Sequence, residues 1–262
     1  MESKYKVSFP SIEPHELDQD ESFYYLEENG EELKLLFHNY DELYRRPGLY
    51  EQLFYDRLKC TSPQKIIETL YSTIGTSQPP FSELRVLDLG AGNGMVGEKC
   101  FERGVARIVG LDISHMANKA LERDRPGIYD AYYVADLMNL SEDVHSQLTS
   151  WNFNCLISVA ALGFGDIAAP SFIKAFNLIE DAGWIAFNIK ETFMDNRDTS
   201  GFSVFVKNLI LTEHLDIYHM ERYQHRLSID GRPLYYFALT GKKNNSIPPD
   251  FLNELGPKHP EV

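Results

Sequence analysis

Residues 86–94 read VLDLGAGNG, an apolar strand that runs directly into a glycine-rich turn. Such a turn between a strand and a helix brings backbone N–H groups close to a ligand, because glycine has no Cβ in the way. Two classes of ligand compete for this loop. Read from Gly92, residues 92–97 match the dinucleotide pattern G-x-G-x-x-G. In that register Asp88 would point its carboxylate at a diphosphate and repel it, so a ligand that carries a cation fits better.

Outward from this loop, short apolar runs alternate with helical segments. Strands are predicted at 86–89, 108–111, 132–135, 155–159 and 184–189, and helices at about 94–103 and after Ser114, Ser141 and Pro170. Near-continuous apolar strands separated by helices are typical of a buried parallel sheet with helices on both faces. The sequence therefore predicts an α/β fold with a Rossmann-like sheet.

The pattern changes after residue 200, where a helix at 202–211 precedes two longer strand-like stretches. These stretches, 215–223 and 233–241, flank a hairpin signal at 229–232. We therefore expect seven strands in all, mostly parallel, with an antiparallel last strand.

Four segments of different character divide the chain. They are an acidic, loosely ordered leader at 1–33, an N-terminal helical cap or lid at 34–80, a cofactor-binding domain at 81–241 and a C-terminal tail at 242–262. Within the cap, Ser62 and Pro63 predict a helix start, with the serine as N-cap and the proline in the first turn.

The composition is that of a soluble globular protein. Of its 262 residues, 43% are hydrophobic and 24% are charged. Lys and Arg number 25 against 39 Asp and Glu, and the net charge of −14 argues against nucleic acid or an anionic membrane as the main partner. Half of this charge lies in residues 1–35. We interpret that segment as solvated, with a docking segment for a basic partner as the alternative.

The three cysteines, Cys60, Cys100 and Cys155, are odd in number and widely spaced, so neither a disulfide framework nor a cysteine-rich metal site is expected. No apolar stretch reaches the roughly 18 residues that a membrane span needs, and the first residues lack a signal-peptide pattern. We expect a cytoplasmic protein, with the nucleus as an open alternative. The sequence does not define the oligomeric state.

The order Asp-x-Gly-x-Gly-x-Gly resembles the first motif of class I S-adenosylmethionine-dependent methyltransferases, and two later acids strengthen this resemblance. Asp112 ends the second strand, 22 residues after Gly90, and Asp136 follows the third. The resemblance implies that Asp88 contacts the methionine end of the cofactor, directly or through water. It implies further that Asp112 holds both ribose hydroxyls and that Asp136 accepts from the adenine amino group. Taken alone, Asp112 could simply precede the Ser114 cap, and Asp136 could be a turn residue.

A narrower resemblance covers most of the chain. The segments that carry it are 39–44 (NYDELY), 59–63 (KCTSP), 125–130 (RPGIYD), 163–166 (GFGD) and 235–237 (YYF). They are similar to the methyltransferase-like subgroup named for the Williams–Beuren chromosomal region, with its bacterial and fungal relatives. There a Y-D-x-x-x-Y segment folds over the cofactor, which implies this role for Tyr40 and Tyr44; packing of a helix on the sheet is the alternative.

Together these motifs define an expected cofactor site. Its residues are Tyr40, Tyr44, Asp88, Gly90, Ala91, Gly92, Asn93, Gly94, Asp112, Ile113, Asp136, Leu137 and Val159. The expected cofactor is S-adenosyl-L-methionine, with S-adenosyl-L-homocysteine as the product.

The acceptor and the catalytic residues are less defined. Residues 158–162 lack the N/D-P-P-aromatic sequence of base- and amide-nitrogen methyltransferases, which again argues against DNA or RNA. No His and carboxylate cluster has metal-ligand spacing, so no metal is expected. A base is needed only for a protonated nucleophile. Glu191, after the fifth strand, and His225 are the candidate bases.

We therefore expect an S-adenosylmethionine-dependent methyltransferase that transfers a methyl group to a small molecule, for example in secondary metabolism, by in-line displacement. A protein side chain is the second class of acceptor. Two alternatives come from other classes of protein: an NAD-binding oxidoreductase, and a non-catalytic partner protein that binds S-adenosylmethionine without transferring the methyl group.

Overall fold

The computed structural model describes residues 4–10, 22–75, 77, 79–162, 166–194 and 202–254. Its centre is a seven-stranded sheet in the order β6-β5-β4-β7-β8-β10-β9. The strands are β4 (Arg85–Leu89), β5 (Arg107–Asp112), β6 (Ala131–Val134), β7 (Cys155–Ser158), β8 (Trp184–Lys190), β9 (Leu215–Leu227) and β10 (Pro233–Lys243). The first five are parallel, and β10 runs antiparallel to both of its neighbours. The predicted mostly parallel sheet with an antiparallel last strand is confirmed.

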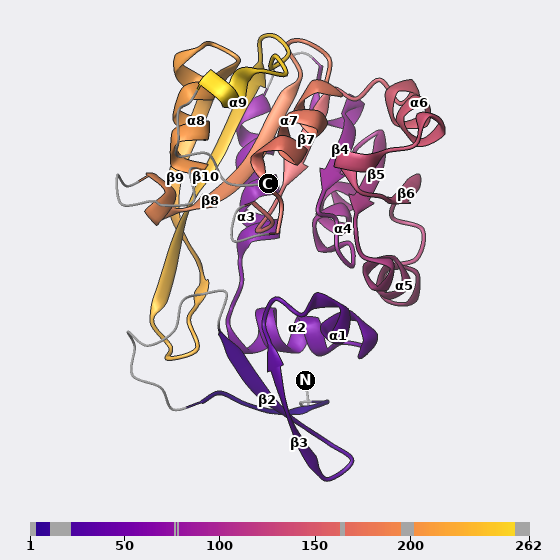
Figure 1. Ribbon diagram of the computed structural model, residues 1–262, viewed down its shortest axis with the longest axis vertical. Coiled ribbons are helices and arrows are strands. Elements are labelled where there is room, and N and C mark those ends of the chain that lie inside the picture. Colours follow the sequence, from indigo (N-terminus) through magenta and orange to yellow (C-terminus); the bar gives the residue numbers. More distant parts are fainter. Residues whose placement is uncertain are drawn as a thin grey trace.

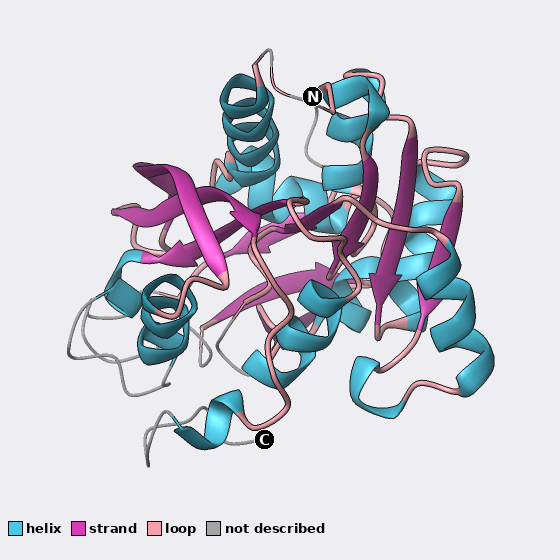
Figure 2. Ribbon diagram, turned by 90° about the horizontal axis from the view of Figure 1, so that it is seen from above, coloured by secondary structure: helices cyan, strands magenta, loops and turns pink. Residues whose placement is uncertain are grey.

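Helices cover both faces of this sheet (Figure 2). They are α3 (Ser62–Ile74), α4 (Met95–Glu102), α5 (His115–Asp124), α6 (Glu142–Ser150), α7 (Ala169–Asn177) and α8 (Phe202–Leu211), with short turns η2 (Phe81–Glu83), η3 (Leu137–Asn139), η4 (Glu191–Met194) and α9 (Phe251–Glu254). The apolar stripes of α3 and α4 pack on one face of the sheet, while those of α7 and α8 pack on the other. Among the described residues, no helix is both long enough and apolar enough to cross a membrane.

The helix starts follow the sequence signals in two cases and depart from them in a third. Ser114 caps α5 by accepting from the N–H groups of Met116 and Ala117, and Ser141 caps α6 in the same way. The predicted Ser62 cap is wrong, because Thr61 occupies the N-cap position of α3 and makes no side-chain cap there. The Ser62 hydroxyl is instead buried among polar side chains of the sheet.

Part of the acidic leader is folded, which corrects the expectation of a loosely ordered segment over residues 1–33. The strands β1 (Lys6–Ser8), β2 (Phe23–Glu28) and β3 (Glu31–Leu36) form a separate antiparallel sheet. In β2 the side chains of Tyr24 and Leu26 are fully buried while their neighbours are not, an alternation of period two that places one face on a core. Residues 1–3 and 11–21 lie outside the described part of the chain.

The cap follows β3 in the sequence and shares one apolar core with the small sheet. It contains α1 (Tyr40–Arg45), α2 (Leu49–Glu51) and a π-helical turn, η1 (Gln52–Arg57). Leu43, Leu49 and Leu53 pack with Tyr24 and Leu26 of the small sheet. The expected boundary at 33/34 therefore falls inside β3, and strands as well as helices build the N-terminal unit, which lies at one end of the large sheet in Figure 1.

The β9–β10 hairpin connects the two units. It extends past the large sheet to the N-terminal unit, where the N–H of Leu227 donates to the Leu58 carbonyl at 2.6 Å (Figure 1). The N–H of Thr61 likewise donates to the His225 carbonyl at 2.9 Å. Residues 242–254 of the expected tail are also attached to the large sheet domain, since Ile247 exchanges two hydrogen bonds with Asn177 at the end of α7.

Candidate functional site

The site lies where four parallel strands end beneath the cap. A cavity of about 390 Å³ opens there, within the size range of small-molecule pockets. Residues from the carboxyl ends of β4, β5, β6 and β7 line it, together with three cap tyrosines, Tyr40, Tyr44 and Tyr50. In open α/β sheets this edge is where ligands bind, because the loops that leave the central strands diverge to opposite faces.

The glycine-rich turn forms one wall of the cavity. Gly90 and Gly92 adopt positive φ angles of 73° and 54°, a backbone region that favours glycine. A Cβ at Gly92 would lie 2.6 Å from the Tyr44 hydroxyl oxygen, and one at Gly90 would lie 2.8 Å from the Cβ of Ala161. Gly94 has a different role: it is not among the residues that line this cavity, and a Cβ there would meet Leu121 of α5 at 2.6 Å.

Asp112 joins this turn to the end of β5. Its Oδ2 accepts from the N–H of Gly92 at 2.8 Å, and its Oδ1 accepts from the N–H of Ser114 at 2.9 Å. Burial raises the pKa of this carboxyl, although the N–H donors oppose the shift. Beside it Ile113 lines the same cavity with 72% of its surface exposed. An aliphatic side chain this exposed at a cavity wall offers apolar contact to a flat ligand.

Asp136 and Leu137 form the neighbouring wall. Asp136 accepts from the N–H of Met138 at 2.8 Å and from the Asn139 amide at 2.6 Å, and these bonds lower its pKa. The carboxylate therefore caps η3, which is the turn role left open by the sequence, and it also lines the cavity. A carboxylate has about four lone-pair sites, so two bonds leave acceptor capacity.

Asp88, in β4, is almost fully buried. Its side chain is 1% exposed and lines neither of the cavities formed by the described residues. Oδ2 accepts from the Tyr129 hydroxyl at 2.6 Å, whereas Oδ1 is buried without a hydrogen-bond partner among the described residues. Burial raises the pKa of Asp88 to about 7. The contact of Asp88 with the methionine end of the cofactor, directly or through water, stays a prediction.

The cap tyrosines line the cavity and pack on one another, so both roles considered for Tyr40 and Tyr44 are present. The ring centroids of Tyr40 and Tyr44 are 6.2 Å apart in a stacked pair, and those of Tyr44 and Tyr50 are 5.2 Å apart. Burial raises the pKa of Tyr40 and Tyr44 well above the usual value, so both phenols stay neutral.

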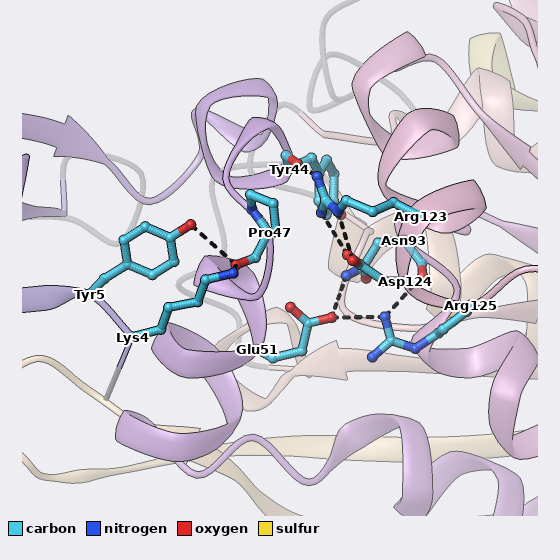
Figure 3. A network of polar contacts seen from close by, with 9 residues as sticks. All are labelled: Lys4, Tyr5, Tyr44, Pro47, Glu51, Asn93, Arg123, Asp124 and Arg125. Carbon is cyan, nitrogen blue, oxygen red and sulfur yellow. Dashed lines mark hydrogen bonds and ion pairs between the residues drawn. The ribbon is translucent and has the colours of Figure 1, made fainter. Parts of the chain in front are cut away.

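Ion pairs and hydrogen bonds fasten the cap to the large sheet (Figure 3). Glu51 Oε1 accepts from Asn93 Nδ2 and from Arg125 Nη1, each at 2.8 Å. Arg123 Nη1 donates to the Tyr44 carbonyl at 3.1 Å. The Asn93 side chain thus helps to hold the cap. Sequence reasoning missed Glu51, although the RPGIYD segment contains its partner Arg125.

A second, smaller cavity of about 80 Å³ continues inward from the first. The two share walls formed by Tyr40, Tyr44, Tyr50, Gly90, Val159, Ala160 and Asp166. Ala91, Gly92 and Asn93 line the inner cavity on the sheet side. Ala160, just past β7, has a φ of 55° and donates its N–H to Asn188 Oδ1 at 2.7 Å. The segment 163–166, apart from Asp166, lies outside the described residues.

The two candidate bases lie in different surroundings. Glu191 lines neither cavity and accepts from Arg222 Nε at 2.7 Å on the surface, and its role as a base stays a prediction. His225 lines the inner cavity, with Nδ1 2.5 Å from the Ser62 hydroxyl oxygen. Burial, and next the neighbouring Arg226, lower the pKa of His225 well below its usual value. In the described part of the chain, no group of three or more His, Cys, Asp or Glu side chains could hold a metal ion.

Comparison with known proteins gives similarity in structure but not in sequence. No family model matches the chain. No curated protein matches it either. A proposed RNA methyltransferase from Pyrococcus horikoshii is similar with a TM-score of 0.52 and 13% identity, over 70% of this chain and 83% of that one. Protein 1320 of Thermoplasma acidophilum is similar with a TM-score of 0.50 and 16% identity, over 69% of this chain and 84% of that one.

Magnesium protoporphyrin IX methyltransferase from Synechocystis was solved with bound S-adenosylmethionine. It is similar with a TM-score of 0.48 and 12% identity, over 70% of this chain and 79% of that one. At these identities the likeness concerns the fold alone. The strand order and the match to the Pyrococcus structure show that the chain has the Rossmann-like fold of class I methyltransferases.

Proposed function

We propose that this protein is an S-adenosylmethionine-dependent methyltransferase. The observation that carries the proposal is the cavity itself: a glycine turn and two carboxylates, Asp112 and Asp136, surround one space beneath the aromatic cap. Carboxylates suit the ribose hydroxyls and the adenine amino group of the cofactor, because both are hydrogen-bond donors. The exposed Ile113 suits the flat adenine ring.

The proposed cofactor site uses most of the predicted residues. Asp112 would hold the ribose, Asp136 and Leu137 the adenine, and the Gly90–Gly92 turn would pass beside the methionine part. The bound sulfonium would supply the methyl group for in-line displacement by a nucleophile. Tyr40, Tyr44 and Tyr50 would exclude water and restrict the approach of the acceptor, and such alignment and desolvation favour methyl transfer.

Binding of a dinucleotide is less compatible with the charges at the glycine turn. A diphosphate would need free N–H groups at the start of α4. Here the N–H of Gly92 already donates to Asp112, and the N–H of Gly94 donates to the Ala91 carbonyl. The carboxylates of Asp112 and Glu51, which both contact this glycine turn, would repel the diphosphate. This supports the methyltransferase over the NAD-dependent oxidoreductase.

The acceptor that we propose is a small molecule. The inner cavity is narrow, enclosed by the cap, and adjoins the cofactor cavity at Gly90, Val159 and Ala160. A protein side chain would have to pass the cap, so we keep it as the second candidate. Membership of the Williams–Beuren-region subgroup is part of the same proposal, and it rests on segments such as NYDELY and RPGIYD.

Calorimetric titration with S-adenosylhomocysteine and with NAD tests the cofactor. We expect the wild type to bind S-adenosylhomocysteine and not NAD. Asp112→Ala should weaken binding at least tenfold, because a hydrogen bond to a charged group contributes about 1.5–3 kcal/mol. Asp216→Ala, on the surface end of β9, is the matched control, and thermal unfolding checks that both variants fold. Binding of NAD alone, or equal binding by Asp112→Ala, would overturn the assignment.

Transfer from labelled cofactor to metabolite and peptide pools tests the acceptor. A labelled small molecule would support the proposal, and a labelled peptide would favour the second candidate. Binding of S-adenosylhomocysteine without transfer to any pool would favour a non-catalytic partner protein.

A further inference from the structure

A β-bulge places two successive polar side chains on the same face of β9. In the β9–β10 pairing, Leu234 lies opposite Arg226 and Tyr235 lies opposite Gln224, so His225 is an extra residue. Successive residues of a strand normally point to opposite faces, and a bulge breaks this alternation. His225 and Arg226 are consequently both buried, at 4% and 6% exposure, and both line the inner cavity.

Arg226 is a buried cation to which the described residues offer no carboxylate partner. Its Nη1 donates to the Leu227 carbonyl at 2.8 Å, and no Asp or Glu of the described residues pairs with it. The guanidinium carbon lies 5.9 Å and 6.0 Å from the ring centroids of Phe37 and Phe54. A guanidinium has five N–H donors, and a buried charge without a counter-ion is costly. The described part of the chain therefore supplies no anion to this guanidinium.

The other charged groups at the inner cavity do not supply that anion. Of the described side chains lining it, only Asp166 is acidic, and His38 Nδ1 lies 3.3 Å from its Oδ1. These two residues lie near the outer rim, with side chains 24% and 21% exposed. Arg226 is deeper, and its positive charge opposes the rise that burial causes in the pKa of Tyr40 and of Cys60 in the cavity wall.

Beside Arg226, a hydrogen-bond network determines which ring nitrogen of His225 carries the proton. Asn188 Oδ1 accepts from the Ala160 N–H, so its Nδ2 donates to the Tyr223 hydroxyl at 2.8 Å. The Tyr223 hydroxyl then donates to Ser62, at 2.7 Å, and Ser62 donates to His225 Nδ1 at 2.5 Å. This arrangement assigns the ring proton of neutral His225 to Nε2.

We propose that Arg226, together with the Nε2–H of His225, binds a carboxylate group in the inner cavity. A planar guanidinium fork matches the two oxygens of a carboxylate, and the imidazole N–H adds a third donor. The proposal rests on the proposed function, which offers two sources of this group. One is the amino-acid carboxylate of the cofactor, and the other is a carboxylate of the methyl acceptor.

Three probes distinguish the sources: S-adenosylhomocysteine; 5′-methylthioadenosine, which lacks the amino acid; and benzoate or propionate added to the protein saturated with S-adenosylhomocysteine. The test variant is Arg226→Gln, and Arg222→Gln, on the exposed face of the same strand, is the control. If the cofactor supplies the carboxylate, Arg226→Gln should bind S-adenosylhomocysteine at least tenfold more weakly and 5′-methylthioadenosine within twofold of wild type.

If the acceptor supplies the carboxylate, Arg226→Gln should bind S-adenosylhomocysteine as the wild type does but lose the binding of benzoate and propionate. The proposal is overturned if Arg226→Gln leaves every probe unchanged, or if it weakens 5′-methylthioadenosine as much as S-adenosylhomocysteine. Should Arg226→Gln fail to fold, Arg226→Met takes its place, because an apolar replacement of a buried charge is often tolerated.

Failure of the proposed function would look different. In that case the wild type binds neither S-adenosylhomocysteine nor 5′-methylthioadenosine. Benzoate and propionate are then titrated into the ligand-free protein, where binding lost in Arg226→Gln supports the subsite and absence of binding in the wild type overturns it.

Discussion

At the scale of single residues, Asp88 carries a measurable pH dependence. The folded protein holds its proton up to a pH of about 7, whereas the usual pKa of 3.8 applies to the unfolded chain. Between these values folding takes up a proton, so the free energy of unfolding falls as the pH rises, by up to about 1.4 kcal/mol per pH unit. We predict that Asp88→Asn removes this contribution, and that its stability relative to wild type increases from pH 4.5 to 7 and is constant above.

Denaturant unfolding at a series of pH values measures this difference, with Asp216→Asn as the exposed control that should follow the wild type. Parallel profiles for wild type and Asp88→Asn would show that the carboxyl ionises normally in the fold.

The residues that sequence could place are those fixed by local rules. Asp112 and Asp136 follow predicted strands, and the carboxyl ends of parallel strands meet at one edge, so their common cavity was predictable. Asp88 was not, because its surroundings depend on Tyr129, 41 residues away, whose ring occupies the space left by Gly97. The Ser62 hydroxyl was misplaced for the same reason: its partners Tyr223 and His225 belong to a distant strand.

At the scale of elements, the attachment of the cap should control how long a ligand stays. Glu51 in α2 contacts both the glycine turn and the RPGIYD segment, through Asn93 and Arg125. We predict that Glu51→Gln speeds the dissociation of S-adenosylhomocysteine about tenfold, because it weakens charge-assisted hydrogen bonds that hold the cap closed. Stopped-flow displacement measures this rate.

Glu42→Gln is the matched control for the cap. Glu42 pairs with Arg45 and Arg46 inside the N-terminal unit, and its carboxylate forms no ion pair with the described residues of the large sheet, so the same change of charge should leave the rate near that of wild type. Equal rates for wild type and Glu51→Gln would mean that the aromatic packing alone holds the cap.

Strands with a regular hydrophobic pattern were predictable from the sequence, and strands in which that pattern is hidden or interrupted were not. The five apolar parallel strands match the prediction closely. The acidic composition of residues 1–35 concealed β2, although Tyr24 and Leu26 alternate with exposed neighbours. The bulge at His225 leaves no signal in the sequence, because it is defined by the register against Leu234 and Tyr235.

At the scale of the whole molecule, the apolar core of the N-terminal unit shares no buried residue with the two cores of the large sheet, as expected for two units of different stability. The N-terminal core is small and contains Leu43, Leu49 and Leu53, whereas the cores of the large sheet contain most of the buried side chains. Small cores bury less apolar surface and open at lower free energy. The cavity lies between the two units, so opening of the smaller one should expose the ligand without unfolding the sheet.

Leu53→Ala tests this division, because truncation of a fully buried leucine costs about 2–5 kcal/mol. We predict faster amide hydrogen exchange in residues 23–57 and weaker binding of S-adenosylhomocysteine, with exchange in β4, β5 and β7 unchanged. Leu156→Ala, in the core of the large sheet, should instead speed exchange throughout the molecule. If Leu53→Ala speeds exchange in β4 as much as in α1, the two units unfold together, and the cap cannot open independently of the sheet.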